Sequence, residues 1–173
     1  MVLLEFTFQY IEGGAIILFA VLIGILLFEF RRMKEKIEDR LDINNEGVRL
    51  RLQALERLTL FAERSGLQNM VSRLQSGTDS AASLHHSLVE TIKTEYDYNA
   101  AQQVYVNREV WSAITRLRDQ NIYIINQLAA TLPPEANALD LSKRILEYSM
   151  TENAELNEIV LNALNYEAQK ILD

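Results

Sequence analysis

Residues 13–28 read GGAIILFAVLIGILLF, sixteen residues without a charge, and residues 31–36 follow as RRMKEK. With its apolar neighbours, the run reaches about the 20 residues that a helix needs to cross a bilayer. Ala20 and Gly24 stand four residues apart, a spacing that allows two membrane helices to approach closely. The run predicts an N-terminal transmembrane helix within residues 1–30. The residues assigned to this span include Gly13, Gly14, Ala20, Gly24 and Phe28.

Positive charge gathers directly after the apolar run, whereas only Glu5 and Glu12 carry charge before it. Lys and Arg are enriched on the cytoplasmic side of membrane helices. We therefore expect the N-terminus on the periplasmic side of a bacterial inner membrane and the rest of the chain in the cytoplasm. The residues of this positive flank are Arg31, Arg32, Lys34 and Lys36.

The composition excludes several classes of function. The chain of 173 residues has no Cys, which rules out disulfides, thiolate catalysis and zinc–thiolate sites. Residues 31–64 contain nine basic and seven acidic residues, whereas residues 134–173 contain three basic and eight acidic ones. No continuous basic face results, so nucleic acid is not an expected partner. The membrane lipid attracts the basic flank and repels the acidic distal end.

Residues 31–46 are predicted to be a charged juxtamembrane helix or spacer, which the turn formers of residues 44–47 interrupt. Residues 47–173 show apolar residues at three- and four-residue steps, which predicts a cytoplasmic all-α bundle of about five helices. Breaks are expected near Gly66, Gly77, residues 104–106 and residues 133–134. The expected core includes Leu55, Leu58, Leu88, Ile92, Ile114, Leu117, Leu128, Ile145 and Leu164.

Helix caps are also readable from the sequence. Residues 76–80 form a polar loop that supplies an N-cap to the next helix, and Asn107 is a suitable N-cap after an extended link at residues 104–106. Residues 151–153 are expected to cap the last helix.

Several stretches resemble an uncharacterised family of small bacterial proteins with one N-terminal span and a cytoplasmic helical region. These stretches are RLQALERL at residues 51–58, EYDYN at 95–99, QQVYV at 102–106, Trp111 and ALDLS at 138–142. The resemblance implies the inner membrane of Gram-negative bacteria. It implies no enzymatic activity and no catalytic residues.

No spacing of residues supplies a catalytic or metal site. His85 and His86 point about 100° apart on a helix, so they cannot chelate one ion together, although His86 and Glu90 are four residues apart. Glu95 and Asp97 project about 200° apart, and Tyr96 falls on the apolar face, which favours a core tyrosine with a bonded hydroxyl. Glycine-rich phosphate loops are also missing. We therefore expect no catalytic residue, no cofactor and no metal.

A contact surface is the remaining candidate for a site. Gln102, Gln103 and Tyr105 lie where a helix gives way to the link, and they either satisfy loop backbone groups or form a recognition surface. Trp111 is expected to pack in the bundle, or to contact a partner if it is exposed. Glu56 and Arg57 are expected to form ion pairs with the bundle.

The sequence therefore favours a non-enzymatic, membrane-anchored structural or adaptor subunit. It would bind a protein partner or self-associate, through the span and the helical domain, at the inner face of the membrane. One alternative is a ligand-binding module or enzyme with a pocket between helices, using Tyr96, Glu95 and His86. Another is a subunit of an ion-conducting or transport assembly, with Glu12 in an ion path.

Overall fold

A computed structural model describes the backbone of residues 2–74, 80–150 and 156–172. Side-chain surroundings within these ranges are described at residues 18 and 19 and from residue 21 onward. The chain divides into two compact units, Met1–Gly47 and Val48–Asp173. The described residues form helices and no strand, apart from one isolated bridge between Ser80 and Asn137. The predicted all-α class is confirmed.

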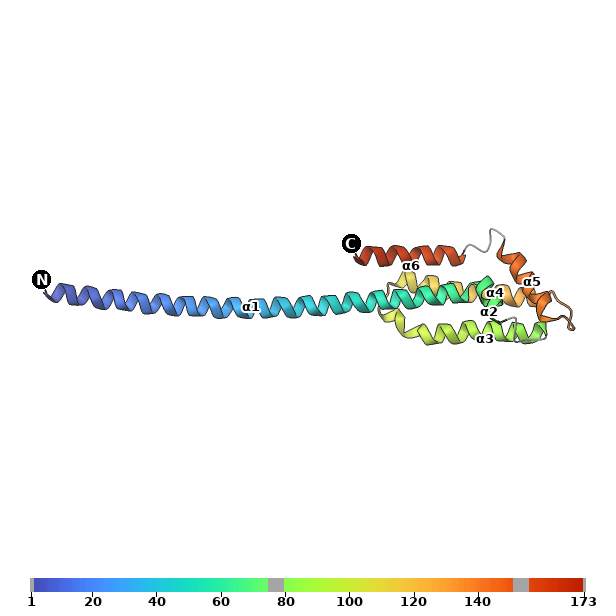
Figure 1. The fold of residues 1–173 in the computed structure, drawn as a ribbon, viewed down its shortest axis with the longest axis horizontal. Helices are drawn as coiled ribbons and strands as arrows, with labels where there is room; N and C mark the ends of the chain where they lie inside the picture. The colour runs from blue at the N-terminus through green and yellow to red at the C-terminus, as the bar shows by residue number, and fades with distance from the viewer. Residues whose placement is uncertain (1, 75–79, 151–155, 173) are drawn as a thin grey trace. The chain divides into compact units, whose positions relative to one another are not determined.

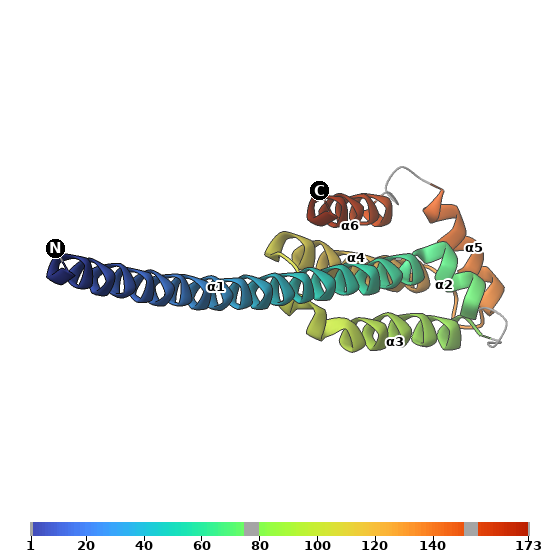
Figure 2. The same cartoon turned by 60° about the vertical axis from the view of Figure 1, so that its left-hand side comes forward.

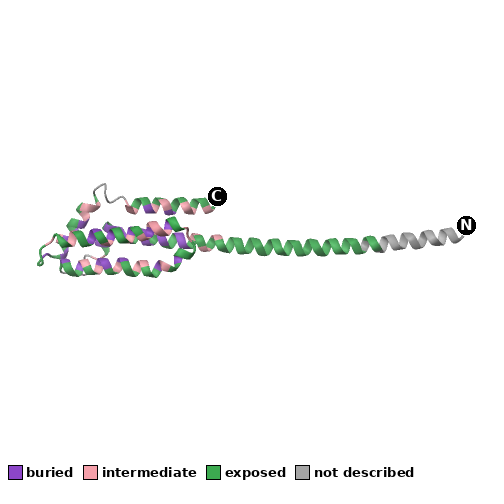
Figure 3. Ribbon diagram, turned by 180° about the vertical axis from the view of Figure 1, so that it is seen from behind, coloured by how far each residue is buried: buried purple, intermediate pink, exposed green. Residues whose placement is uncertain are grey.

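The first unit is part of a single helix. α1 (Val2–Ser65) runs through this unit and continues into the second. Every side chain described between residues 18 and 47 is exposed (Figure 3). The predicted interruption at residues 44–47 is wrong, because Asn and Gly each cost only about 0.5–1 kcal/mol in a helix interior and good helix formers surround them. A Cβ atom added at Gly47 would meet nothing within 4 Å, so packing does not require this glycine.

No helix in the described part of the chain combines the length and the hydropathy of a membrane span. Gly13, Gly14 and Ala20 of the predicted span lie outside the residues whose side chains are described, as do residues 15–17. Gly24 and Phe28 are described, and both are exposed.

The second unit is a helical bundle made of the end of α1 and five further helices. These are α2 (Leu67–Leu74), α3 (Ala81–Asn99), α4 (Arg108–Ala130), α5 (Ala138–Ser149) and α6 (Leu156–Leu172). α3 and α4 run alongside the C-terminal part of α1, and α6 lies next to α4 (Figures 1 and 2). The described bundle therefore has six α-helical segments, where the sequence predicted about five.

Two apolar clusters form the core of the bundle, and α4 contributes to both. One cluster joins α2, α3, α5 and the C-terminal half of α4. The other joins the end of α1 to the N-terminal half of α4 and to α6, around Leu58, Phe61 and Ile114. Of the predicted core residues, Leu128 is only partly buried and packs against the first cluster, whereas the other eight are buried.

Side-chain caps define the starts of three helices. Ser80 Oγ accepts a hydrogen bond from the Ser83 amide at 3.2 Å, and Asn107 Oδ1 accepts one from the Val110 amide at 2.8 Å. Both predicted N-caps are confirmed. Asn137 and Asp140 form a capping box at α5, a reciprocal pair that the sequence analysis missed. The predicted cap at residues 151–153 and the break at Gly77 lie outside the described residues.

Loss of the Asn107 cap should destabilise the bundle measurably. Asn107→Ala should lower the free energy of unfolding by about 1 kcal/mol, because the Val110 amide loses its acceptor. Asn107→Ser should keep most of the stability, since a hydroxyl can accept the same bond. Urea unfolding followed by circular dichroism compares the two, and equal losses would show that the cap is not responsible.

Two predicted connections differ from the structure. The link at residues 104–106 is not extended, because the 3-10 helix η2 (Ala100–Val104) continues from α3 and a turn follows it. A break does occur at Gly66, but no described glycine has a positive φ. A Cβ at Gly66 would instead lie 3.3 Å from the Asn157 side chain and 3.3 Å from the Glu63 carbonyl oxygen. Close approach of α6 and of the helix end, rather than a left-handed conformation, favours glycine there.

Candidate functional site

An aromatic cluster on α1, α3 and α4 holds Tyr96 in the bundle. The Tyr96 ring lies edge-on to Phe61, at 6.0 Å between centroids, and is tilted against Trp111 at 5.3 Å. The guanidinium carbon of Arg118 lies 4.1 Å from the centre of the same ring. Aromatic pairs and cation–π contacts at these separations each stabilise by about 0.5–1.5 kcal/mol.

Hydrogen bonding fixes the Tyr96 hydroxyl as well. Its oxygen lies 3.0 Å from Thr115 Oγ1, and Thr115 Oγ1 in turn donates to the Trp111 carbonyl oxygen at 3.0 Å. Because the threonine proton is used in the second bond, the Tyr96 hydroxyl is the donor in the first. The predicted bonded hydroxyl is confirmed, and the ring is partly buried against the core cluster rather than fully inside it. Tyr96 therefore supports the alternative pocket enzyme poorly.

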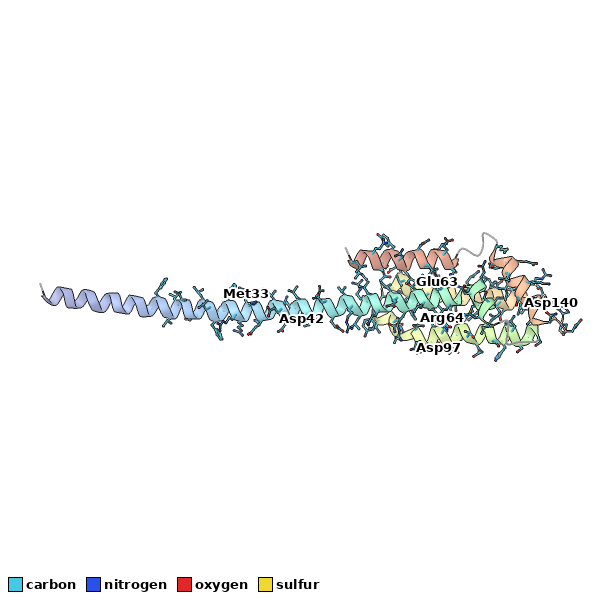
Figure 4. All side chains as sticks on the ribbon, in the orientation of Figure 1. Met33, Asp42, Glu63, Arg64, Asp97 and Asp140 are labelled. Atoms are coloured by element: carbon cyan, nitrogen blue, oxygen red, sulfur yellow. The ribbon has the colours of Figure 1, made fainter. Side chains whose placement is uncertain are left out.

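Glu95 ties three helices together on the neighbouring face. Its Oε1 lies 2.9 Å from Arg64 Nη2 of α1 and 3.3 Å from Arg73 Nη1 of α2. Arg73 Nη2 also donates to the Arg64 carbonyl oxygen at 2.6 Å. Figure 4 labels Arg64 on α1 and Asp97 on the adjacent α3, where Asp97 is exposed. The network closes one end of a groove between α1 and α3.

That groove is open and has a volume of about 410 Å³. Its floor is the buried ring of Phe61, and exposed Leu60 and Tyr98 form its apolar rim. The remaining lining residues are Arg57, Arg64, Thr94, Glu95 and Asn99. We call this feature, lined by these eight residues, the α1/α3 groove.

Arg57 gives the α1/α3 groove a free positive charge. Its guanidinium lies 5.3 Å from the centre of the Tyr98 ring, and its Nη2 donates to the Tyr98 hydroxyl at 3.3 Å. In the described part of the chain, no carboxylate lies within ion-pair distance of Arg57, and Glu56 is exposed without a polar partner. The predicted ion pairs of Glu56 and Arg57 are therefore wrong. The groove combines two guanidinium groups with one carboxylate and has excess positive charge.

The contact surface predicted around η2, made of Gln102, Gln103, Tyr105 and Trp111, is only partly exposed. Gln103 is exposed, but its side chain donates to the carbonyl oxygen of Ala100 at 3.0 Å, which satisfies a local backbone group. Tyr105 is exposed, and Trp111 is half-buried in the aromatic cluster. Gln102 is buried, so the prediction that it belongs to a surface is wrong. The 3-10 turn that replaces the expected extended link rotates this side chain inward.

The positive flank lies on α1 in the first unit. Arg31, Arg32, Lys34 and Lys36 are all exposed, and Lys34 Nζ lies 3.6 Å from Glu38 Oε1. An exposed pair of this kind contributes at most about 0.5 kcal/mol. These charges remain available to an anionic surface or to another chain.

The histidines have ordinary surroundings. His85 Nε2 lies 2.7 Å from Asn126 Oδ1, which makes that ring nitrogen the donor, and His86 is exposed. Within the described residues no three metal-binding side chains gather at one place.

Two other hollows occur in the second unit. One, of about 160 Å³, is lined largely by carboxamides, and Asn157 Oδ1 is buried there without a hydrogen-bond donor among the described residues. The other, of about 510 Å³, lies between α4 and α6 and is shallow. The larger hollow also carries two arginines and a glutamate, Arg108, Arg116 and Glu109, but none of its lining residues is aromatic, whereas Phe61 and Tyr98 line the α1/α3 groove.

The fold and the groove define an all-helical bundle with a groove lined by charged and aromatic side chains. The chain belongs to a family of unknown function, DUF7935, whose model matches residues 1–171. The prediction of an uncharacterised family is thereby confirmed, whereas its bacterial and inner-membrane setting stays a prediction. No curated protein and no solved structure matches the chain.

Proposed function

We propose that this protein is a non-enzymatic adaptor, anchored in a membrane by its N-terminal segment, that docks a partner protein in the α1/α3 groove. The bundle would lie in the cytoplasm, at the inner face of a bacterial membrane. The observation that carries the proposal is the composition of the groove, which places exposed tyrosine, leucine and arginine side chains around a buried aromatic floor. Tyrosine and arginine dominate the energetics of protein interfaces.

The exposed surface of α1 supports the anchor. Every large apolar side chain described from Leu18 to Phe30 is 41–66% exposed. Monomeric soluble proteins rarely expose a continuous apolar surface of this extent. Because these residues point in all directions around the helix, a lipid bilayer covers them better than a single partner face does. The basic flank directly after them supports the inward orientation of the bundle.

Charge and spacing favour an acidic, amphipathic helix as the occupant of the groove. Arg57 and Arg64 are seven residues apart on α1, which separates them by about 10.5 Å along the helix axis. A partner helix with two glutamates seven residues apart can face both guanidinium groups, and an apolar side chain between them can contact Leu60 and Phe61. This is the helix-in-groove mode of recognition, with carboxylate–guanidinium pairs that fix the register.

Photo-crosslinking in cells tests this docking directly. A photo-reactive amino acid replaces Leu60 in the groove, and in a matched control it replaces Leu139, an equally exposed leucine on α5. We expect a discrete adduct from position 60 and none of the same mass from position 139. Mass spectrometry of the adduct should place the crosslink on an acidic, amphipathic segment.

Charge reversal makes the test specific. Arg57→Glu, combined with the photo-reactive residue at position 60, should reduce the adduct by at least about tenfold, since a repulsive pair replaces an attractive one. Reversal of the facing glutamate in the identified segment should restore the adduct. An adduct that is unaffected by Arg57→Glu, or a crosslink to a basic segment, would contradict the proposed docking.

A further inference from the structure

A second exposed apolar feature lies on α1, after the predicted span. Met33, Ile37 and Leu41 follow one another at four-residue steps in a stretch that is otherwise rich in charge. They are 56%, 53% and 54% exposed, and no described residue covers them. Figure 4 shows Met33 projecting from the helix in this region. The bundle core makes no use of these residues, so another role must account for the stripe.

The apolar stripe covers a narrow angular range of the helix surface, and polar residues lie on the opposite face. At 100° per residue, Phe30, Met33, Leu41 and Asn44 all project within about 40° of Ile37. The opposite direction is occupied by acidic residues. Glu35, Asp39 and Glu46 all project within about 20° of it. A narrow seam of this kind is typical of a helix that pairs with one other helix.

We propose that Met33, Ile37, Leu41 and Asn44, together with Phe30 at the very end of the predicted span, form the seam of a parallel coiled coil between two copies of this chain. The proposal rests on the proposed function only for the parallel direction of the two helices. Two copies anchored by their N-terminal segments in one membrane have their helices running in the same N-to-C direction. Contact between two identical seams buries the exposed side chains of both copies.

Flanking charges favour a second copy over other occupants. Glu29 precedes the seam residue Phe30, and Lys34 follows Met33. In a parallel coiled coil, the residue just before one seam position lies opposite the residue five places later in the partner chain, which just follows the next seam position. Glu29 of each copy therefore meets Lys34 of the other. The dimer thereby gains two symmetric ion pairs. A lipid surface is the poorer occupant of the seam, because amphipathic helices on anionic membranes carry Lys and Arg opposite their apolar side, whereas Glu35, Asp39 and Glu46 lie directly opposite this seam.

Asn44 sets the register of the pair. A single asparagine in an otherwise apolar seam pairs with its own equivalent in a parallel dimer and disfavours shifted alignments. The seam steps are 3, 4, 4 and 3 residues, so Phe30 to Leu41 and Met33 to Asn44 each span 11 residues.

Single-cysteine crosslinking tests the seam, and the absence of native Cys makes the test clean. The full-length chain in its membrane carries one cysteine at position 33, 37 or 41 in the seam, or at position 35 or 39 on the back. Mild oxidation followed by a non-reducing gel measures the dimer. We expect at least roughly tenfold more dimer from the seam positions, because only there do the Cβ atoms of two copies approach disulfide distance.

The outcomes separate this proposal from the proposed function. Equal yields from seam and back positions, or no dimer at all, would overturn the seam. A disulfide that forms between Met33→Cys and Leu41→Cys chains when mixed, but not within either variant alone, would show antiparallel pairing and overturn the parallel arrangement. Neither result affects the adduct at position 60, which reports on docking alone. Ile37→Asp should abolish the dimer while that adduct persists.

Discussion

Leu58→Ala should lower the free energy of unfolding of the bundle by about 2–5 kcal/mol, the range typical of truncating a fully buried leucine. Leu58 is 0% exposed and lies in the cluster that joins α1, α4 and α6. Removing its three terminal carbons leaves a cavity between helices that cannot collapse without moving all three. Ile114→Ala, in the same cluster, should have an effect of the same size. Denaturant unfolding at equilibrium measures both.

The same helix offers a matched control. Leu60 lies two residues further along α1 and is 54% exposed, so Leu60→Ala should change the free energy of unfolding by less than about 0.5 kcal/mol. A similar loss at both positions would mean that the bundle faces of α1 are assigned wrongly. Because Leu60 lines the groove, the same variant should weaken docking while stability is kept.

Val21→Arg should remove the chain from the membrane fraction to a large extent. Position 21 is close to the middle of the predicted span, where an arginine costs about 2.5–3.5 kcal/mol of insertion free energy, on the order of a 100-fold change in the insertion equilibrium. Alkaline carbonate extraction of membranes, followed by quantification of the chain in pellet and supernatant, measures the change.

Ile43→Arg is the matched control for this substitution. Ile43 is also an exposed apolar residue of α1, but it lies in the charged stretch after the predicted span. The same new charge at position 43 should leave the membrane fraction unchanged. If Val21→Arg and Ile43→Arg behave alike, the apolar segment acts through contact with protein rather than through insertion into lipid.

Local signals in the sequence predicted most of the fold. Ser80 and Asn107 cap helices where the sequence places them, because an N-cap depends on one side chain and the amide three residues later. Apolar periodicity identified buried positions such as Leu88 and Ile145 for the same reason, since the helical repeat alone decides which side chains share a face.

The predictions from sequence were wrong or incomplete where the preference of a few residues for a turn competes with a long helix, or where a distant residue decides the local structure. Residues 44–47 favour a turn, but the helix continues through them because the cost of Asn and Gly is small against a long helix. The break at Gly66 was expected, but the close approach that favours glycine there involves Asn157, ninety-one positions later in the chain. No local pattern carries that contact.

The α1/α3 groove could not be predicted, because its parts are far apart in the sequence. Arg57 pairs with Tyr98, forty-one residues away, and Arg64 pairs with Glu95, thirty-one residues away. A carboxylate, the commoner partner of an arginine, was expected for Arg57. A cluster of Arg57 and Arg64 on one helix, together with exposed Leu60 between them, was the available signal for a contact face.

The most direct test of the central claim compares the crosslink from position 60 in three forms of the protein. These are the full chain, a soluble fragment of residues 31–173, and this fragment fused to an unrelated membrane span. Tethering raises the local concentration of the bundle at its partner without any new contact. We predict that the adduct is lost in the soluble fragment and returns with the unrelated span. An undiminished adduct from the soluble fragment would contradict a membrane-anchored adaptor.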